Sequence, residues 1–445
     1  MNANEELARL PRELADALTK PFTRFLGVEA AGSAVLLLSA LAALAVANSP
    51  WGHLYLSAWE TPAGFRVGPI EFVRTLRDWV NDGFMTLFFF LVALELKREL
   101  VLGELKNPRT AALSIAAALG GMLVPSILYL ALQWGEPGQT GWGTVMATDT
   151  AFVIGCVALL GPRLPQSLRV FMLSLAIVDD VGAILVVAVG YNSHIVWGAL
   201  GVGAAGLAVV LVMALVGLRG FPIYFLAGGL SWLAVDASGI HATITGVILG
   251  LLTPARRWVS DDRLYAILDR VIAHPSGDRG SGDTQNRETL QLAEIAARET
   301  LSPLERLEVA LHPWVGFVVM PLFALANAGL PLSLGEVGNA VTVAVFVGFV
   351  VGKPIGILTF SWLAVRSGIA VRPPDLSWGL LAGGALLAGI GFTMALFIAN
   401  LSLAADLIDG AKLGILLASV VSAIAGLALL RFVCAKSAVT PAEPR

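Results

Sequence analysis

The chain has 445 residues, of which 57% are hydrophobic and only 14% are charged, and its mean hydropathy is +0.79. This composition excludes an ordinary soluble globular protein and favours a membrane protein throughout. The formal net charge of −3 says little by itself, because the positions of the charges matter more than their sum. The two cysteines, Cys156 and Cys434, predict neither a disulfide framework nor a metal-binding site.

Apolar stretches long enough to cross a bilayer, or nearly so, recur along the whole chain. The first resembles a signal peptide, but it is too long for a signal core and follows a segment with both acids and bases, so we interpret it as a transmembrane helix. The pattern predicts an all-α membrane protein of about twelve spans. They lie near residues 28–48, 77–97, 111–133, 144–161, 168–190, 197–217, 221–235, 240–253, 310–329, 339–365, 376–400 and 410–432.

The basic residues alternate between the loops. They precede the first span and follow the even-numbered spans, whereas loops 134–143, 190–197, 235–240, 329–340 and 401–410 contain no lysine or arginine. Because cytoplasmic loops carry the excess of basic residues, both termini are expected in the cytoplasm. The first outer loop, 49–75, breaks the pattern with Arg66 and Arg74. The expected location is the inner (plasma) membrane of a bacterium.

The spans divide the chain into five parts. We expect a cytoplasmic N-terminal segment (1–27), spans one to eight (28–253), a cytoplasmic loop (254–307), spans nine to twelve (308–435) and a cytoplasmic tail (436–445).

Two stretches outside the spans have patterns of their own. Near 60–75, the stretch Phe65–Phe72 alternates around Gly68-Pro69 and predicts a small outer β-hairpin. In the long loop, the spacing of 263–273 and 288–298 predicts two helices along the surface. This loop could be a regulatory domain or a plain tether.

Two adjacent aspartates, Asp179 and Asp180, lie in the middle of the fifth span. Val170–Val178 before them and Val181–Gly190 after them carry no charge. A carboxylate at bilayer depth is costly, and chains keep one where it faces a bundle interior or a wet cavity on an ion path. The alternative, a cytoplasmic cap mistaken for a span, conflicts with the apolar residues on both sides. The pair therefore predicts ion movement.

Three further charges stand alone in predicted spans: Asp149, Lys353 and, early in span two, Asp82. Burial favours the neutral form of each group unless acids and bases pair. The surplus of acids over one lysine suits a cation, and carboxylate, hydroxyl and carbonyl oxygens suit Na⁺ or Li⁺ better than a soft metal. A purely structural ion pair is the alternative role for Lys353, and both roles are compatible.

Two spans contain residues that weaken a helix. Span four carries Ala147–Ala151, and span eleven carries Ala388–Met394, with glycines and hydroxyls in mid-span. Backbone groups freed there could be satisfied by a partner or an ion. We expect spans 3–5 and 10–12 to form two inverted repeats whose discontinuous helices, spans four and eleven, cross at the bilayer centre.

An ordered set of motifs resembles the NhaA family of sodium/proton antiporters. The resemblance runs from about Phe25 to Phe432, and the set is specific although each motif alone is modest. The motifs are Ala147-Thr148-Asp149, Ala176–Ala183, Ser238–Thr243, His312-Pro313-Trp314, Gly352-Lys353-Pro354 and Gly389–Met394.

The resemblance implies a role for each matched residue. Asp179 and Asp180 would bind the metal ion (Na⁺ or Li⁺). Asp149, Thr148 and Lys353 would belong with them to the ion- and proton-binding site, with Lys353 as the partner of the first aspartate. Asp149 and Thr148 would form the span-four crossing. The span-eleven crossing would contain Gly389, Gly391 and Thr393.

A pH response is implied for a second group of residues. It comprises charges at a cytoplasmic funnel (Glu95, Lys97, Arg98, Glu99 and Glu308) together with His241, for which a hydrogen bond at a helix start is the alternative. Two features depart from the family pattern. Val309 stands where a second histidine is expected, and the 254–307 loop is longer than usual, so the pH set point stays open.

The function implied is a pH-dependent, electrogenic antiporter, not an enzyme, that exports cytoplasmic Na⁺ or Li⁺ in exchange for external protons. It would need no cofactor, bind no nucleic acid, and form a homodimer in membrane lipid. One alternative is a Na⁺-coupled symporter of a small organic solute, which needs a larger polar pocket. Another is a membrane-embedded protease, which fits poorly because the two aspartates of such a dyad come from separate segments.

Overall fold

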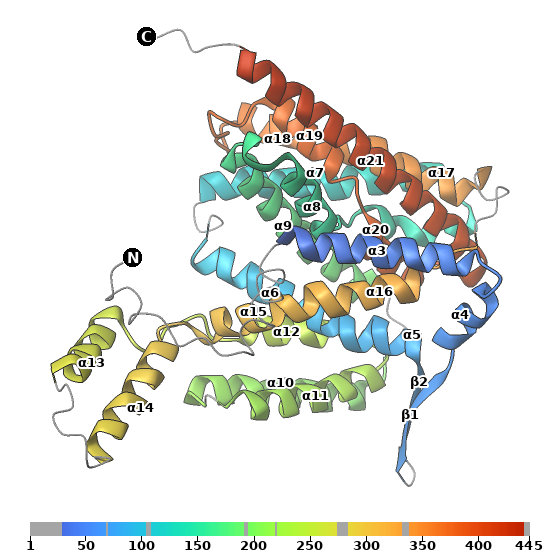
Figure 1. The fold of residues 1–445 in the computed structure, drawn as a ribbon. Helices are drawn as coiled ribbons and strands as arrows, with labels where there is room; N and C mark the ends of the chain where they lie inside the picture. The colour runs from blue at the N-terminus through green and yellow to red at the C-terminus, as the bar shows by residue number, and fades with distance from the viewer. Residues whose placement is uncertain are drawn as a thin grey trace.

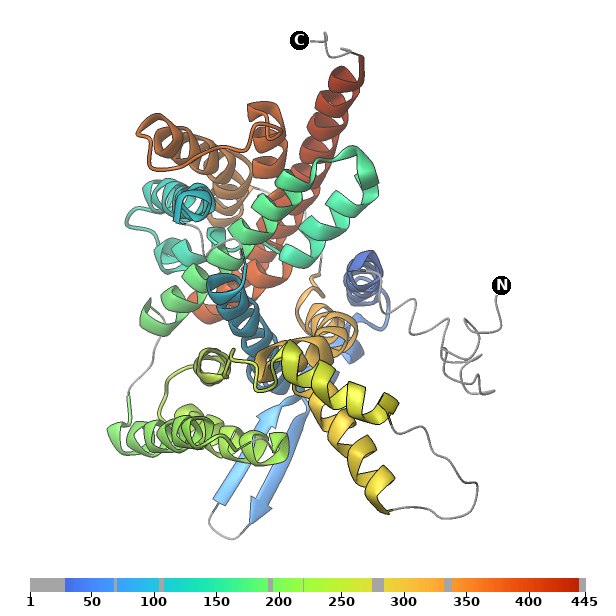
Figure 2. The ribbon, with the colours of Figure 1, turned by 90° about the vertical axis from the view of Figure 1, so that its left-hand side faces the viewer.

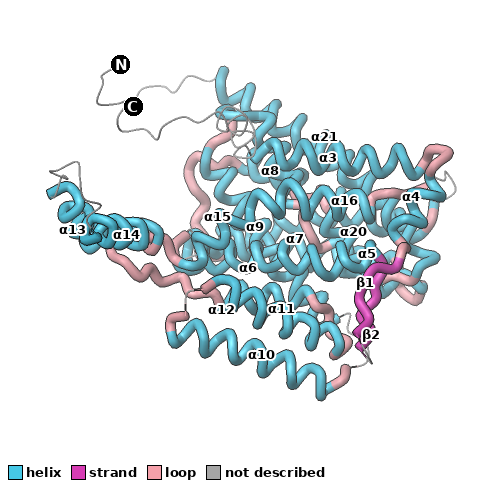
Figure 3. Tube along the Cα trace, turned by 60° about the horizontal axis from the view of Figure 1, so that its bottom comes forward, coloured by secondary structure: helices cyan, strands magenta, loops and turns pink. Residues whose placement is uncertain are grey.

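The computed structural model describes residues 29–67, 70–103, 108–190, 195–218, 220–273, 284–331 and 338–439. The predicted N-terminal segment 1–27, the end of the tail and the tip of the hairpin at Gly68-Pro69 lie outside these residues. The described part is helical apart from one two-stranded sheet, as Figure 3 shows. A helical fold is therefore confirmed.

The first half of the chain holds the elements up to the long loop (Figure 1). They are α3 (Glu29–Ala47), α4 (Gly52–Trp59), β1 (Pro62–Val67), β2 (Ile70–Thr75), α5 (Leu76–Asp78), the π-helical segment η1 (Trp79–Phe84), α6 (Met85–Val101), α7 (Pro108–Leu132), the 3₁₀ segment η3 (Pro137–Val145), α8 (Thr150–Leu160), the short η4 (Gly161–Arg163), α9 (Gln166–Gly190), α10 (Trp197–Val216), α11 (Phe221–Ala237) and α12 (Thr243–Leu252).

The second half begins with two helices in the loop and returns to the bundle. Its elements are α13 (Asp261–Ala273), α14 (Thr284–Arg298), α15 (Pro303–Trp314), the π-helical segment η5 (Val315–Val319), α16 (Met320–Asn327), α17 (Ala340–Val347), the π-helical segment η7 (Gly348–Gly352), α18 (Lys353–Arg366), α19 (Trp378–Leu387), α20 (Phe392–Ser402) and α21 (Ala405–Val439).

Six helical runs of the described residues are long and apolar enough to cross a membrane: 111–132, 166–187, 197–216, 303–327, 340–366 and 405–436. Three bent pairs, α3 with α4, η3 with α8 and α19 with α20, bring the number to nine if each pair is one span. The helices α11 and α12 are apolar but shorter. The chain is thus a multi-pass membrane protein, and the count of twelve spans stays a prediction.

The predicted β-hairpin near 60–75 is confirmed. The strands β1 and β2 pair antiparallel from Pro62↔Thr75 to Val67↔Ile70. The sequence pattern missed α4, which follows α3 after a turn of 119° in the same outer loop. In Figure 1 the hairpin lies toward the opposite end of the bundle from the start of α3 and the end of α21.

Small residues bring α7 and α18 close together. A methyl group on Gly120 would lie 2.2 Å from the carbonyl oxygen of Gly356, and one on Gly356 would lie 2.0 Å from that of Gly120. Such close approach is how helices pack in a bilayer, where apolar burial gives no advantage over lipid. Because Lys353 begins α18, this contact sets the depth of the lysine in the bundle. In Figure 2, α10 and α11 lie apart from this packed group.

Candidate ion-binding site

The adjacent aspartates lie in the middle of α9, as the sequence predicts. Asp179 is 0% and Asp180 4% exposed, although α9 otherwise reads as an apolar membrane span. Because both side chains are buried, the neighbouring protein groups strongly influence the chemistry of these carboxyl groups.

Lys353 is the ion-pair partner of Asp179. Its ammonium nitrogen lies 3.1 Å from Asp179 Oδ2, and both side chains are fully buried. The same nitrogen donates a hydrogen bond to the backbone carbonyl of Met146, in the break before α8. Lys353 of α18 therefore links Asp179 of α9 to the backbone of Met146 in the break before α8. The alternative of a structural ion pair is compatible with this geometry.

Thr148 is the second group that contacts Asp179. Its hydroxyl lies 2.6 Å from Asp179 Oδ2 and 3.2 Å from the carbonyl oxygen of Ala388. A hydroxyl has one hydrogen to donate, and the shorter contact assigns it to the carboxylate. Thr148 thus orients Asp179 from a residue that also touches the break in the span of α19 and α20.

The two helix breaks meet each other. The break between η3 and α8 bends the chain by 43°, and that between α19 and α20 bends it by 50°. At the contact, the backbone N–H of Asp149 donates to the carbonyl of Ile390 at 2.7 Å. Backbone groups freed by one break are thereby satisfied by the other, which is what a low-dielectric interior requires.

The Asp149 carboxylate holds the starts of two helices. Its Oδ1 accepts the backbone N–H of Phe152 at 3.2 Å, which caps α8. Its Oδ2 accepts the backbone N–H of Thr393 at 2.9 Å, in the first turn of α20, and the hydroxyl of the same residue. A negative charge is favourable where two helix N-termini converge. Both oxygens of Asp149 therefore already have protein donors.

Asp179 and Asp180 each keep one oxygen with no such donor. Within the described part of the chain, the buried atoms Asp179 Oδ1 and Asp180 Oδ1 have no hydrogen-bond partner. Asp180 Oδ2 lies 3.4 Å from the hydroxyl of Thr150, a contact that the sequence did not single out although Thr150 follows Asp149 directly. A buried carboxylate oxygen without a protein donor can accept a proton, a cation or a water hydrogen. The pair thus offers two hard ligand atoms of this kind.

The predicted pH-response residues form two groups. At the end of α6, Arg98 pairs with Glu308 of α15 and lies 3.3 Å from Glu99. Lys97 donates to the carbonyls of Leu251 and Thr253 at 2.7 Å each, at the C-terminal end of α12.

His241 is not part of that cluster. It precedes the N-terminal end of α12, whereas Lys97 contacts the C-terminal end, so the ten residues of the helix separate the two. Any effect of His241 on the charges at the other end must act through α12 or through the electrostatic field. Glu95 lies on α6, within one turn of Arg98.

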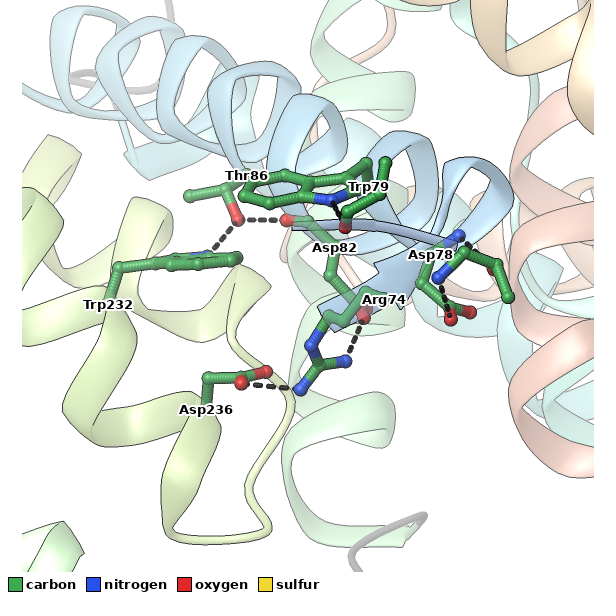
Figure 4. Close-up of polar contacts among 9 residues, drawn as sticks. Arg74, Asp78, Trp79, Asp82, Thr86, Trp232 and Asp236 are labelled. Carbon is green, nitrogen blue, oxygen red and sulfur yellow. Dashed lines mark hydrogen bonds and ion pairs between the residues drawn. The ribbon is translucent and has the colours of Figure 1, made fainter. Parts of the chain in front are cut away.

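Asp82 belongs to a separate cluster around the β-hairpin (Figure 4). Arg74 of β2 lies 3.1 Å from Asp82 Oδ2 and 2.5 Å from Asp236 Oδ2 at the end of α11. Beside them, Trp79 and Trp232 are stacked with ring centroids 6.5 Å apart. The two carboxylates more than offset the charge of the one guanidinium in this cluster.

A buried asparagine cluster was missed by the sequence reasoning. Asn327, 1% exposed at the end of α16, donates to Asn81 Oδ1 at 2.8 Å and accepts from Asn400 at 3.0 Å. The cluster joins η1, α16 and α20. Asparagine in an apolar helix is a weak signal by itself, and only the meeting of three of them makes a network.

Comparison with known proteins places this geometry in a family. The sequence model described as Na⁺/H⁺ antiporter 1 matches residues 23–430. The chain belongs to the NhaA family of sodium/proton antiporters.

Its relatives are bacterial and match over nearly their whole length. The chain is 62% identical over 429 residues to the Na⁺/H⁺ antiporter NhaA 2 of Acidiphilium cryptum, covering 96% of both chains. It is 61% identical to the Na⁺/H⁺ antiporter NhaA of Rhizobium meliloti, covering 95% of this chain and 97% of the relative. The Na⁺/H⁺ antiporter NhaA 2 of Vibrio vulnificus is 55% identical, with 97% and 96% covered. Every predicted site residue lies inside the matched region.

Proposed function

We propose that the chain exports Na⁺ or Li⁺ in exchange for protons, by competition of the two ions for Asp179 and Asp180. The observation that carries this proposal is the pair of buried oxygens, one on each aspartate, that have no donor within the described residues. A carboxylate accepts either a hard cation or a proton, but it cannot hold both at one oxygen. Competition for one site, exposed to each side of the membrane in turn, is sufficient for exchange.

The other residues of the site support this role without binding the ion themselves. Thr148 and Lys353 fix Asp179 from two other spans, and Lys353 offsets one of the two negative charges. With one Na⁺ bound, two carboxylates and one ammonium form a neutral set. We infer that Asp149 keeps its protein donors and stabilises the two helix N-termini while the pair loads and unloads.

Charge counting supports electrogenic exchange. Two carboxyl groups can take up two protons where one Na⁺ leaves, so one cycle would carry one net positive charge inward. Because protons and Na⁺ compete, transport should depend on pH. The charges near Arg98 and Glu308 would shift that dependence through the local potential.

The topology proposed for this function has twelve spans, cytoplasmic termini in a bacterial inner membrane, and inverted repeats in spans 3–5 and 10–12. The contact between the two helix breaks supports the repeats, because discontinuous helices at a repeat interface are a recurring design in secondary transporters. Lipid and a second copy of the chain are the proposed partners, the latter through the outer hairpin.

The two alternatives receive no support from the geometry. A cavity of about 420 Å³ lies between α6, α10, α11 and α12, but it is mostly apolar and the aspartate pair does not line it. An organic solute bound there would not contact either aspartate of the pair. A protease dyad needs two facing aspartates, whereas Asp179 and Asp180 are neighbours on one helix.

Exchange in vesicles tests the proposal. In proteoliposomes, Na⁺ should dissipate an imposed ΔpH without any organic solute, and Asp180→Asn should abolish this response while the protein still inserts and folds. The amide keeps the shape but neither takes up a proton nor offers a full charge. Asp406→Asn, at an exposed position at the start of α21, is the matched control and should exchange normally. A normal Na⁺-dependent ΔpH in Asp180→Asn would refute the assignment.

A further inference from the structure

The long loop forms a helical hairpin beside the membrane-spanning bundle. The helices α13 and α14 pack on each other, and they lie at the end of the bundle where α12 ends and α15 begins. In Figure 1, where the spans run from left to right, they lie beyond the left-hand ends of the spans, and in Figure 2 they reach past the outline of the bundle. For spans that cross a bilayer along their length, this is the end that faces the head groups of one leaflet.

The base of this hairpin is fixed to the bundle. Glu299, directly after α14, forms an ion pair with Arg306 of α15 at 2.7 Å, and the two side chains are 8% and 11% exposed. The backbone N–H of Val259, just before α13, donates to the carbonyl of Glu299. Nearby, the N–H of Leu304 donates to the carbonyl of Pro254. Both ends are therefore held at the level where the spans leave the membrane.

One side of α14 runs outward from this fixed base. Glu299, Ile295 and Leu292 follow each other at spacings of four and three residues, which places them in one stripe along a helix. At Glu299 the stripe contacts the end of a span, and the residue is buried. About 6 and 10 Å further along the axis, at a rise of about 1.5 Å per residue, the same stripe carries Ile295 and Leu292. These are 50% and 46% exposed.

We propose that α14 lies on the surface of this leaflet and inserts Leu292 and Ile295 among the lipid chains. The side of the helix that meets the bundle at its base must continue to face the membrane where the bundle ends. Trp258, 53% exposed and next to the base, adds an aromatic side chain of the kind enriched at the membrane interface. The inference is independent of which ion the protein exchanges.

The net charge of the loop indicates whether its attachment to lipid is electrostatic or apolar. Residues 254–307 hold eight arginines and nine acidic residues, so the loop has no net basic charge to attract anionic lipid. Apolar contact should therefore dominate, and attachment should depend little on salt or on the content of anionic lipid. A second copy of the chain and a soluble protein are the competing occupants of the stripe.

Depth measurements on single labelled positions test the proposal in the full chain. Cys156→Ala and Cys434→Ser give a background without cysteine, whose Na⁺-dependent ΔpH is checked first. An environment-sensitive probe is then attached to Leu292→Cys or Ile295→Cys, and to the matched controls Glu294→Cys and Ala297→Cys. Each control is two residues further on, about 200° round the helix, and is also exposed.

The protein is reconstituted in neutral phosphatidylcholine vesicles that contain a quencher on the lipid chains. Quenching at positions 292 and 295 should exceed that at 294 and 297 by about threefold or more, because an interfacial helix buries only its apolar face. The difference should persist at high salt and when anionic lipid is added.

Three results would overturn the proposal. The first is equal quenching of both pairs, or quenching of neither. The second is an apolar probe environment at 292 and 295 that disappears when the protein is diluted to one copy per vesicle, which would assign the stripe to a second copy. The third is an apolar probe environment that arises only after a soluble extract is added, which would assign the stripe to a protein partner. Loss of Na⁺-dependent ΔpH in these variants would concern the proposed function only. The quenching pattern would still test the contact of α14 with lipid.

Discussion

Lys353 combines complete burial with a single carboxylate partner. Its ammonium lies against Asp179 Oδ2 and the Met146 carbonyl, and the ring of Phe349 is 5.9 Å away. The desolvation cost of a buried pair is offset only while both partners are present. The lysine should therefore contribute mainly to stability, and less to the binding of the transported ion.

We predict that Lys353→Ala lowers the stability of the folded protein by roughly 3–5 kcal/mol, because it leaves a buried carboxylate uncompensated. The variant protein should bind a proton at Asp179 instead, so its exchange profile should move along the pH axis. The Tm in detergent and the pH profile of Na⁺-dependent ΔpH measure the two effects.

A second buried lysine provides the control. Lys412 of α21 is 8% exposed, and no carboxylate of the described residues lies within ion-pair distance of it. Lys412→Ala should lower the Tm less than Lys353→Ala. If Lys353→Ala changed neither the Tm nor the pH profile, its pairing with Asp179 in the membrane would be excluded.

At the scale of the elements, the crossing of the two broken spans depends on Asp149. Its carboxylate accepts the backbone N–H groups of Phe152 and Thr393 and the Thr393 hydroxyl, at the starts of α8 and α20. The same break places Thr148 against Asp179. The crossing therefore orients the ion-binding pair as well as satisfying its own backbone.

We predict that Thr393→Val destabilises the crossing by about 1.5–3 kcal/mol, the usual value for a hydrogen bond to a charged group. Valine keeps the branched shape and removes the hydroxyl that donates to Asp149. Thr393→Ser keeps the hydroxyl and should stay near the wild type. The Tm and the apparent affinity for Na⁺ should both fall in the valine variant, and neither should fall in the serine variant. Equal behaviour of the two variants would show that the hydroxyl has no role.

The β-hairpin is an element with two uncovered edges in a single chain. Among the described residues β1 and β2 form a two-stranded sheet, so each has an outer edge with no further strand on it, although Trp79 donates to the Ala63 carbonyl of β1 near the base. A hairpin of this kind is a template for a second copy. At its base, Arg74 ties it to α11 through Asp236, so it is held firmly on the bundle.

At the scale of the whole molecule, we predict a homodimer joined by these hairpins. Replacing residues 62–73 by a short glycine-serine linker should give monomers that still exchange ions, because the proposed ion-binding residues lie elsewhere. Arg74 is kept so that the cluster with Asp82 stays intact. Light scattering in detergent and exchange in vesicles measure the two outcomes. Dimers that persist in the deletion variant would rule out the hairpin as the contact.

The pH dependence of transport is also a property of the whole molecule. As pH falls, protons occupy Asp179 and Asp180 and the site loses Na⁺, so activity should fall on the acid side. A tenfold increase in Na⁺ should move the acid limb to lower pH by about 0.5–1 unit, depending on how many protons compete. Exchange measured from pH 6 to 9 at two Na⁺ concentrations checks this.

Two variants separate competition from a distinct sensor. Glu95→Gln and His241→Ala should displace the profile without abolishing transport, because both variants keep Asp179 and Asp180, the groups proposed to bind the ion. A profile that does not respond to Na⁺ concentration would contradict simple competition and favour a separate conformational sensor.

Features that depend on residues close together in the chain could be predicted from the amino-acid sequence alone. Hydropathy over each window of the sequence located the segments that became helices, and the isolated charges picked out Asp179, Asp180, Asp149 and Lys353. The turn residues of 65–72 predicted the hairpin. These signals are local because the cost of a charge or a free backbone group in lipid applies to each position separately.

Which of these side chains contact each other could be seen only in the tertiary structure. Thr393 reaches Asp149 across 244 positions of the chain, and Arg74 finds its second aspartate 162 positions away in α11. The cluster around Asn327 and the position of His241 at the far end of α12 were likewise not deducible. Such meetings depend on how closely helices approach, as at Gly120 and Gly356, and that distance results from the packing of many side chains at once.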